Sequence, residues 1–350
     1  MPRSAKAHNP LRFGNMSTPR LFSGMQPSAD SLHFGNYAGA LLQWIEMQNT
    51  HDAVFCVVDL HALTVPQDPA TLAENTRKTA AQYIASGIDP KKSTLFVQSH
   101  VPAHSELAWI LNTVTAFGEA SRMTQFKDKS QKQGSDNATV GLFTYPVLQA
   151  ADILAHDANM VPVGEDQRQH IELTRDIATR FNQRFGEVFT IPEVTIMKGA
   201  AKIYDLQNPT SKMSKSGESP AGILWLLDEP AALTKKIKSA VTDTDNSIHF
   251  DPDTKPGVSN LLSLLALATH RSVEDVVSAL SGSGYGALKV EVAEAVVELG
   301  SPIRDKTHEL LSDPAELDRL LAVGAEKAEA TAQATLHRAH QALGLLPRLS

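Results

Sequence analysis

The chain has 350 residues, of which 20% are charged and 42% hydrophobic, a balance typical of a globular enzyme with a sizeable core. Its length suits one large domain with a smaller one beside it. The formal net charge of -7 argues against indiscriminate binding to nucleic acid, because such binding depends on an excess of Lys and Arg, although a local basic patch is compatible with it. No apolar run reaches the roughly 18–20 residues that span a bilayer, so we expect no membrane association.

The single cysteine, Cys56, lies in an apolar run over 54–58 and predicts neither a disulfide nor a thiolate metal site. A reducing compartment follows, and we expect a cytoplasmic protein. The N-terminal 29 residues contain basic residues but no acid, so residues 1–19 are predicted to form a disordered basic extension. A transit peptide, or a true start at Met16, would explain the same composition.

The first half of the chain alternates between strand and helix patterns. Apolar runs predict strands over 21–25, 53–60 and 93–97, and helices are expected over 33–45, 69–87 and 103–117. Asp68 and Pro69 are typical of a helix start, and Gly87 is typical of its end. The alternation predicts right-handed crossovers and a parallel sheet with helices on both faces. Ligands of such sheets bind beyond the carboxyl ends of the strands.

The pattern returns with a strand over 161–163 and a helix over 165–185, and after residue 219 it becomes helical, with helices expected over 231–240, 258–268, 273–280, 288–299 and 314–343. We therefore predict a Rossmann-like catalytic domain over 20–212, with a short connecting insertion near 100–160. A helical domain, which includes the lysine loop described next, is predicted over 213–350. The insertion is near the lower size limit of an independent domain, so we expect no further large domain within it.

Two strings far apart carry the chemistry. His33-Phe34-Gly35-Asn36 stands where a loop enters a helix, so polar side chains and a positive helix end can face phosphate oxygens, and Gly35 lets a nucleotide approach the backbone. Lys212-Met213-Ser214-Lys215-Ser216 stands in a loop, where mobile lysines suit departing pyrophosphate. Alone, the first string reads as a capped helix start and the second as a lysine-rich surface loop.

Together, the two strings resemble the paired ATP-binding signatures of class I aminoacyl-tRNA synthetases, and a specified pentapeptide like the second arises by chance in only about one chain in ten thousand of this length. The chemistry agrees with the resemblance. Activating a carboxylate with ATP needs positioning and positive charge near the α-phosphate more than it needs acid–base groups.

Further stretches, which lie before, between and after the two strings, narrow the resemblance to bacterial tryptophanyl-tRNA synthetases. The related tyrosyl enzymes share the fold but usually carry a different string around the Asp166-Gln167 pair. The stretches that carry the resemblance are 22–28, 57–62, 87–90, 122–130, 150–154, 161–167 and 240–243.

This resemblance implies a pocket for the amino acid. Asp152 matches the carboxylate that accepts the indole N–H of tryptophan, and its apolar neighbours favour a buried, partnered carboxylate over a charge on a helix surface. The other substrate-binding positions that match are Phe22, His61, Tyr145, Gln149, Val161, Val163 and Gln167.

The same resemblance implies an ATP site. The matching catalytic positions are His33, Asn36, Lys127, Lys129, Lys212 and Lys215. Further nucleotide contacts are implied at Gln26, Ser28, Gly35, Gly164, Asp166, Ile203, Met213, Ser214 and Ser216. We expect ATP to arrive with Mg²⁺, and nothing in the sequence resembles a dedicated protein metal cage.

Three positions depart from the family pattern. His33 stands where many bacterial relatives have Thr, which restores the more general class I string. Gln149 replaces a Met beside the indole, which leaves the polarity of the pocket open. Lys202 replaces an Arg ahead of the lysine loop, which keeps the charge and loses bidentate phosphate geometry.

The sequence therefore predicts a ligase that forms tryptophanyl-adenylate from ATP and L-tryptophan and then transfers the amino acid to tRNA(Trp). The resemblance also implies that the helical domain over 213–350 recognises the tRNA and its anticodon. It further implies a homodimer in which each tRNA bridges the catalytic domain of one subunit and the helical domain of the other. Two alternatives stay open: a tyrosyl-tRNA synthetase, and a non-catalytic paralogue that binds tRNA or tryptophan.

Overall fold

Five parallel strands form one sheet in the order β3-β2-β1-β4-β5. The computed structural model describes residues 18–27, 31–126, 138–196, 201–214 and 219–347. The strands are β1 (Arg20–Met25), β2 (Asp52–Val57), β3 (Thr94–Val97), β4 (Met160–Val163) and β5 (Glu193–Ile196). Leu21 of β1 is in register with Ala53 on one side and Met160 on the other. The strand order reverses at β1, which is where open α/β sheets bind their ligands.

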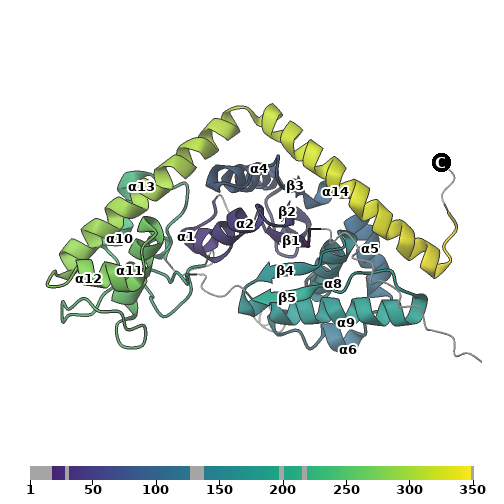
Figure 1. The fold of residues 1–350 in the computed structure, drawn as a ribbon, viewed down its shortest axis with the longest axis horizontal. Coiled ribbons are helices and arrows are strands. Elements are labelled where there is room, and N and C mark those ends of the chain that lie inside the picture. Colours follow the sequence, from purple (N-terminus) through teal and green to yellow (C-terminus); the bar gives the residue numbers. More distant parts are fainter. Residues whose placement is uncertain (1–17, 28–30, 127–137, 197–200, 215–218, 348–350) are drawn as a thin grey trace, which may run out of the picture.

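Helices cover both faces of the sheet, which confirms the predicted Rossmann-like architecture (Figure 1). On one face, Leu21 and Phe55 pack with α2 (Leu42–Met47) and α4 (Pro69–Ser86). On the other face, Phe22 and Cys56 pack with α5 (Ala103–Asn112), α8 (Val140–Ala155) and α9 (Arg168–Phe185). Successive residues of a strand point to opposite faces of the sheet. Because helices cover both faces, the residues that point to either face must be apolar.

The predicted helix over 69–87 is confirmed as α4. The Asp68 carboxylate accepts the Ala70 N–H at 2.9 Å, and Gly87 ends the helix with a φ of 121°, a backbone conformation that favours glycine. This helix shows that capping residues alone located both of its ends.

Several predicted boundaries were wrong. The strand over 53–60 ends at Val57, because the Asp59 carboxylate accepts the N–H groups of Leu60 and Ser99 and turns the chain into the short helix α3 (Asp59–Ala62). The helix over 103–117 stops at Asn112, where threonine hydroxyls bond to carbonyls of the preceding turn, and α6 (Phe117–Ala120) follows separately. The strand β5 and the helix α8 were not predicted.

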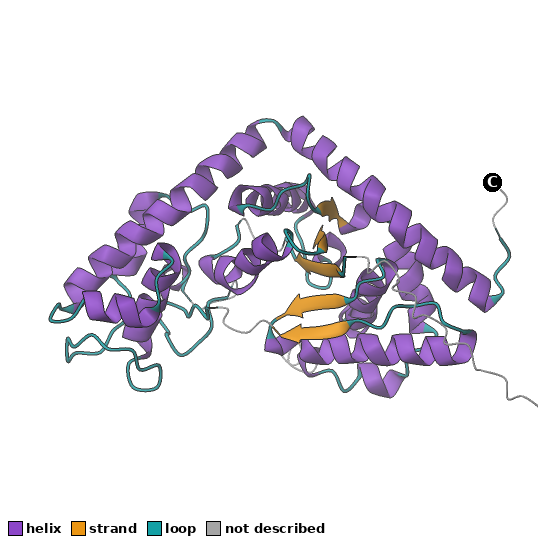
Figure 2. Cartoon of the chain, in the orientation of Figure 1, coloured by secondary structure: helices purple, strands orange, loops and turns teal. Residues whose placement is uncertain are grey.

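Helices make up most of the regular structure of residues 219–347 (Figure 2). They are α10 (Pro230–Lys238), α11 (Pro256–Thr269), α12 (Val273–Ala279), α13 (Tyr285–Ser312) and α14 (Pro314–Leu343). Helices α10 to α13 share an apolar core with the α2–α4 face of the sheet. No helix of the described residues is long and apolar enough to cross a membrane.

The last helix returns to the sheet. Helices α13 and α14 meet at a sharp corner, and α14 runs back over the strands (Figure 1). At Gly324 a Cβ atom would lie 1.7 Å from the Leu95 carbonyl oxygen, so α14 touches the backbone of the edge strand β3. Two ion pairs, Arg77–Asp318 and Arg338–Asp157, fix its ends. The region predicted as one helical domain over 213–350 thus contacts the sheet through its final helix, and the boundary at residue 213 stays a prediction.

Candidate active site

A cavity of about 510 Å³ opens at the carboxyl ends of β1, β2 and β4. Its walls include Gln26, Val58 and Val163, which stand at or just beyond those strand ends. A hollow of about 800 Å³ lies elsewhere, at the amino ends of β1 and β2, and none of the predicted site residues lines it. The ion pair Arg20–Asp52 already occupies part of that wall, so the cavity at the carboxyl ends of the strands is the candidate site.

The first signature string lines this cavity and caps its own helix. His33 Nδ1 accepts the Asn36 N–H at 3.2 Å, and Asn36 Oδ1 accepts the His33 N–H at 3.1 Å, at the start of α1 (Phe34–Asn36). A Cβ on Gly35 would lie 2.9 Å from His33 Nδ1. The first string therefore forms a capped helix start in the cavity wall, and the absence of a Cβ at Gly35 leaves room for the imidazole of His33.

The described part of the second string lies beside the first, since a Cβ on Gly35 would lie 3.6 Å from Met213 Cβ. Lys212 is exposed and forms an antiparallel bridge with Tyr204, and the Met213 N–H donates to the Ile203 carbonyl at 3.1 Å. Lys212, Met213 and Ser214 line the cavity. Ile203 is buried and does not line it, and Lys202 is exposed outside the lining. The contribution of Ile203 to this loop is therefore a backbone hydrogen bond to Met213 and not a side-chain contact in the cavity.

A short segment that follows the second string in sequence is hydrogen-bonded to the first string. The Phe34 N–H donates to the Leu224 carbonyl at 2.9 Å, and the Leu226 N–H donates to the Leu32 carbonyl at 2.8 Å. The rings of His33 and Trp225 meet edge to face at 6.0 Å. The chain that follows the lysine loop is therefore bonded directly to the first string.

Asp152 is a buried carboxylate with three donors. Its side chain accepts hydrogen bonds from His61 Nε2 at 2.7 Å, Gln98 Nε2 at 2.7 Å and His104 Nδ1 at 2.6 Å, and the residue is 1% exposed. Burial alone would raise the pKa of this carboxyl, but the hydrogen bonds from His104 and His61 hold the pKa well below its usual range. Asp152 is therefore ionised at neutral pH, and its apolar neighbours correctly indicated a buried, partnered group.

Apolar and polar residues complete the wall. Phe22, Gln149, Val161 and Val163 line the cavity with His61 and Asp152. The Tyr145 hydroxyl lies 2.9 Å from His170 Nε2 and donates to Gln125 Oε1 at 3.2 Å, and burial raises the pKa of Tyr145 to about 12. The phenol is neutral at ordinary pH, so it can serve as a hydrogen-bond donor.

The segment that follows β4 is also part of the wall. Gln167 Nε2 donates to Asp166 Oδ2 at 2.9 Å, and a Cβ on Gly164 would lie 2.7 Å from Asp166 Oδ1. Gly164, Asp166 and Gln167 all line the cavity. Close approach of the backbone to this carboxylate explains why glycine precedes it.

Five predicted residues lie outside the described part of the chain: Ser28, Lys127, Lys129, Lys215 and Ser216. Conversely, the structure adds wall residues that were not predicted, namely Ser23, Gly24, Met25, Gly39, Ala40, Val58, Gln125 and Ile153. Most of them lie in the stretches that carry the family resemblance or one helical turn after Asn36, so the same stretches could have identified them. Within the described residues, no group of three or more His, Cys, Asp or Glu could hold a metal ion.

Comparison with known proteins agrees with this geometry. A family model described as class I tRNA synthetases (W and Y) matches residues 15–300. The chain is 62% identical over 329 residues to a tryptophan–tRNA ligase of Leifsonia xyli subsp. xyli, which covers 94% of this chain and 98% of the relative. It is 60% identical to the tryptophan–tRNA ligase 2 of Streptomyces avermitilis, with the same coverage.

Solved structures give the same result. The fold matches a tryptophanyl-tRNA synthetase from Mycoplasma pneumoniae with a TM-score of 0.86 at 35% identity, covering 94% of this chain and 98% of that one. The enzyme from Campylobacter jejuni, in complex with ADP and tryptophan, matches with a TM-score of 0.81 at 36% identity, covering 93% and 100%. With both signatures on one cavity of this fold, the chain belongs to the class I aminoacyl-tRNA synthetases, in the bacterial-type tryptophanyl family.

Proposed function

We propose that the chain activates L-tryptophan with ATP, releases pyrophosphate and transfers the amino acid to the terminal ribose of tRNA(Trp). The observation that carries this proposal is one cavity at the strand ends, whose wall holds parts of both signature strings and the buried carboxylate of Asp152. This combination supplies a nucleotide site and an amino-acid site that share one space.

The first step needs little proton transfer. The ionised carboxylate of tryptophan attacks the α-phosphorus of ATP. A bond forms between a carboxylate oxygen and this phosphorus, and the bond from the phosphorus to the oxygen of the departing pyrophosphate breaks. Lys212, exposed on the cavity wall, together with Lys215, Lys127 and Lys129, would balance charge on the phosphates. His33 and Asn36, at the start of α1, would orient the triphosphate, and the bound ATP would carry Mg²⁺ held mainly by phosphate oxygens.

The amino-acid end of the cavity has the character that an indole requires. We propose that the indole lies among Phe22, Val161 and Val163 and donates its N–H to Asp152. Gln26, Tyr145 and Gln167 would face the amino and carboxylate groups of the substrate, while Gly164 and Asp166 would face the ATP ribose. Gln149 would stand beside the indole, where its amide oxygen would face the partly positive edge of the ring.

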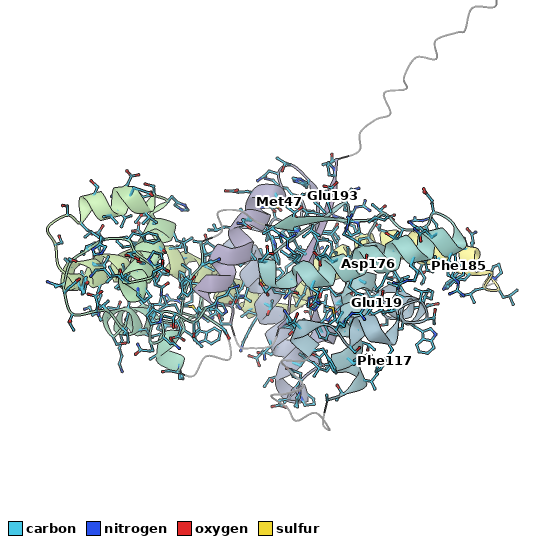
Figure 3. All side chains as sticks on the ribbon, turned by 90° about the horizontal axis from the view of Figure 1, so that it is seen from below. Met47, Phe117, Glu119, Asp176, Phe185 and Glu193 are labelled. Atoms are coloured by element: carbon cyan, nitrogen blue, oxygen red, sulfur yellow. The ribbon has the colours of Figure 1, made fainter. Side chains whose placement is uncertain are left out.

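A homodimer is the second part of the proposal. Four large apolar side chains are strongly exposed on α5, α6, α8 and the loop after α3: Trp109 at 71%, Phe117 at 77%, Val140 at 77% and Leu63 at 58%. Phe117 lies on the opposite side of the sheet-containing part from Met47 and Glu193 (Figure 3). Exposed apolar groups of this size are typical of protein interfaces. In such a dimer each tRNA would bridge two subunits in the cytoplasm.

Two assays test the proposal. ATP–pyrophosphate exchange should depend on tryptophan and should not proceed with tyrosine, and tRNA charging should follow with tryptophan alone. Exchange supported by tyrosine would identify a tyrosyl enzyme, and tight binding of tryptophan without any exchange would identify a non-catalytic paralogue. Sedimentation of the wild type beside Phe117→Ser should report a dimer that the substitution weakens.

A further inference from the structure

We infer that Gln98 and His104 determine the selectivity of the amino-acid pocket by fixing Asp152, and that they leave Oδ2 as the oxygen offered to the ligand. The inference rests on the proposed function, because it requires that a substrate N–H meets Asp152. Neither residue lines the cavity, so both are positioning residues.

The two carboxylate oxygens of Asp152 have different surroundings. Oδ1 accepts two hydrogen bonds, from Gln98 Nε2 at 2.7 Å and from His104 Nδ1 at 2.6 Å. Oδ2 accepts one, from His61 Nε2 at 2.7 Å, and His61 itself stands in the cavity wall. An ionised carboxylate has about four acceptor sites, two on each oxygen, so Oδ1 is filled and Oδ2 can accept one more donor. That donor has to come from the cavity side.

Gln98 can present only its amide donor to the carboxylate. It is fully buried at the end of β3, and its Oε1 accepts the Leu60 N–H at 3.1 Å. Because the oxygen is committed there, the amide nitrogen faces Asp152. The same bond anchors the start of α3, the short helix that carries His61. Gln98 therefore sets the position of both groups that meet at Oδ2.

His104 extends this support to the aromatic wall of the cavity. Its other ring nitrogen, Nε2, lies 3.0 Å from His156 Nε2, and the His156 ring stacks on Phe22 with centroids 5.4 Å apart and planes 9° apart. Phe22 lines the cavity. Burial and the nearby His104 hold the pKa of His156 well below its ordinary range, so this ring stays neutral. His104 thus lies between Asp152 and the aromatic wall, and the contact with Phe22 is made by His156, which the His104 variants leave in place.

Loss of either donor would leave the buried anion short of one hydrogen bond. The carboxylate would then turn toward its remaining donors or take up a proton, and in both cases Oδ2 would become a poorer acceptor for a ligand N–H. The space available to an aromatic ring would hardly change. The expected defect is therefore specific to substrates that carry the N–H.

The test compares tryptophan with its analogue in which sulfur replaces the indole nitrogen, using ATP–pyrophosphate exchange on the full chain. His104→Leu and Gln98→Met should each lower kcat/KM for tryptophan about 10- to 100-fold, as expected for loss of a hydrogen bond to a buried charge, and should leave the sulfur analogue nearly unchanged. His104→Asn keeps an N–H near the position of Nδ1 and should recover most of the preference for tryptophan.

A matched control and an internal ratio make the result decisive. His100 is exposed in the same turn as Gln98, and His100→Leu should leave both substrates unaffected. The ratio of kcat/KM values is measured on one preparation, so it does not depend on the fraction of folded protein. If His104→Leu fails to fold, His104→Asn and Gln98→Met carry the test.

Two results would overturn the inference: an unchanged ratio in Gln98→Met and the His104 variants, or equal losses for both substrates, which would mean a merely structural role. Absence of any tryptophan-dependent exchange in the wild type is a separate outcome, since it would remove the proposed function itself.

Discussion

Asp152 combines full burial with a negative charge, and it does so because three donors replace the water that it loses. A pocket wide enough for an indole also admits the smaller rings of phenylalanine and tyrosine, so size alone cannot select tryptophan. A buried polar group that only the correct substrate satisfies can discriminate by about 10⁴–10⁵-fold. At the scale of single residues, selectivity therefore depends on this carboxylate.

Asp152→Ala should lower kcat/KM for tryptophan far more than for tyrosine, phenylalanine or the sulfur analogue, because only the indole N–H loses its acceptor. It should also lower the free energy of unfolding by about 1–3 kcal/mol, since buried donors lose their partner. Pyrophosphate exchange and urea unfolding measure the two effects. Asp176→Ala, an exposed change on α9, is the control, and equal loss for every amino acid would mean that Asp152 is only structural.

His156 should make stability depend on pH. Burial lowers the pKa of His156 well below the ordinary value of 6.5, and the nearby His104 and Arg20 lower it further. The charge of Asp152 raises this pKa but does not outweigh the other effects. Below about pH 6.5, the ordinary pKa of histidine, the unfolded chain binds a proton at His156 that the folded chain does not bind. The free energy of unfolding should therefore fall with decreasing pH by up to about 1.4 kcal/mol per pH unit. At pH values well above 6.5, His156 is neutral in both states and makes the free energy of unfolding no more dependent on pH.

Urea unfolding between about pH 7 and pH 5 checks this expectation, because that range lies around and below the ordinary pKa of histidine. His156→Gln cannot take up the proton and should show a flatter pH dependence than the wild type. Identical slopes for the two proteins would mean that His156 does not titrate on unfolding.

The sequence predicted the residues that line the cavity better than the buried residues that hold them in position. His33, Asn36, Asp152 and Lys212 belong to contiguous strings, and such strings are visible in a single sequence. Gln98, His104 and His156 carry no local pattern, because the fold brings them to Asp152 and Phe22 across strands and helices. Which polar residues become buried partners depends on tertiary packing, and a one-dimensional pattern does not contain it.

At the scale of elements, long regular patterns were predicted and short or mixed ones were not. Helix α4 has a cap, a proline and a terminal glycine, and both of its ends were found. Strand β5 has only four residues and is half exposed, so no apolar run marked it. Helix α8 contains Pro146, which usually argues against a helix interior.

Gly324 is the point where α14 touches the edge strand. Gly324→Ala should destabilise the fold by about 1–3 kcal/mol or more, because the added Cβ would meet the Leu95 carbonyl and force the helix away from the strand. Urea unfolding measures the change. Gly286→Ala is the control, since a Cβ there meets nothing within 4 Å, and this change should be neutral or mildly stabilising. Equal stability of the two variants would contradict the close contact.

The lysine loop should act on the rate and not on tryptophan binding. Lys215→Ala is expected to lower the adenylation rate by orders of magnitude, and Lys212→Ala should act in the same direction but less severely, because their charges serve the phosphates in the transition state. Single-turnover adenylation and tryptophan binding at equilibrium separate the two effects. An unchanged rate in both variants would remove the loop from the mechanism.

At the scale of the whole molecule, an acidic chain must still bind tRNA. Lys235, Lys236 and Lys238 form a basic cluster on α10, but Lys236 Nζ pairs with Asp228 at 2.6 Å and donates to the Ile223 carbonyl. Lys235 and Lys238 are exposed on one side of the helix. The structure therefore separates a structural lysine from two that can meet phosphates.

Replacing Lys235 and Lys238 with Gln should weaken tRNA binding and reduce the slope of log K against log salt by about two, roughly one per phosphate contact. Pyrophosphate exchange without tRNA should be unaffected. Lys91→Gln with Lys92→Gln changes the net charge equally at exposed positions on the sheet side and serves as the control. An unaltered salt slope would show that these two lysines are ordinary surface residues.

The path of α14 also bears on how the protein forms during synthesis. Strand β3 is complete by residue 97, yet the helix that covers it ends at residue 343. A nascent chain therefore carries an uncovered strand edge for most of its time on the ribosome, and such edges pair readily with other chains. Chains that end prematurely between residues 197 and 313 would keep that edge permanently, so we expect them to aggregate even though all five strands are present.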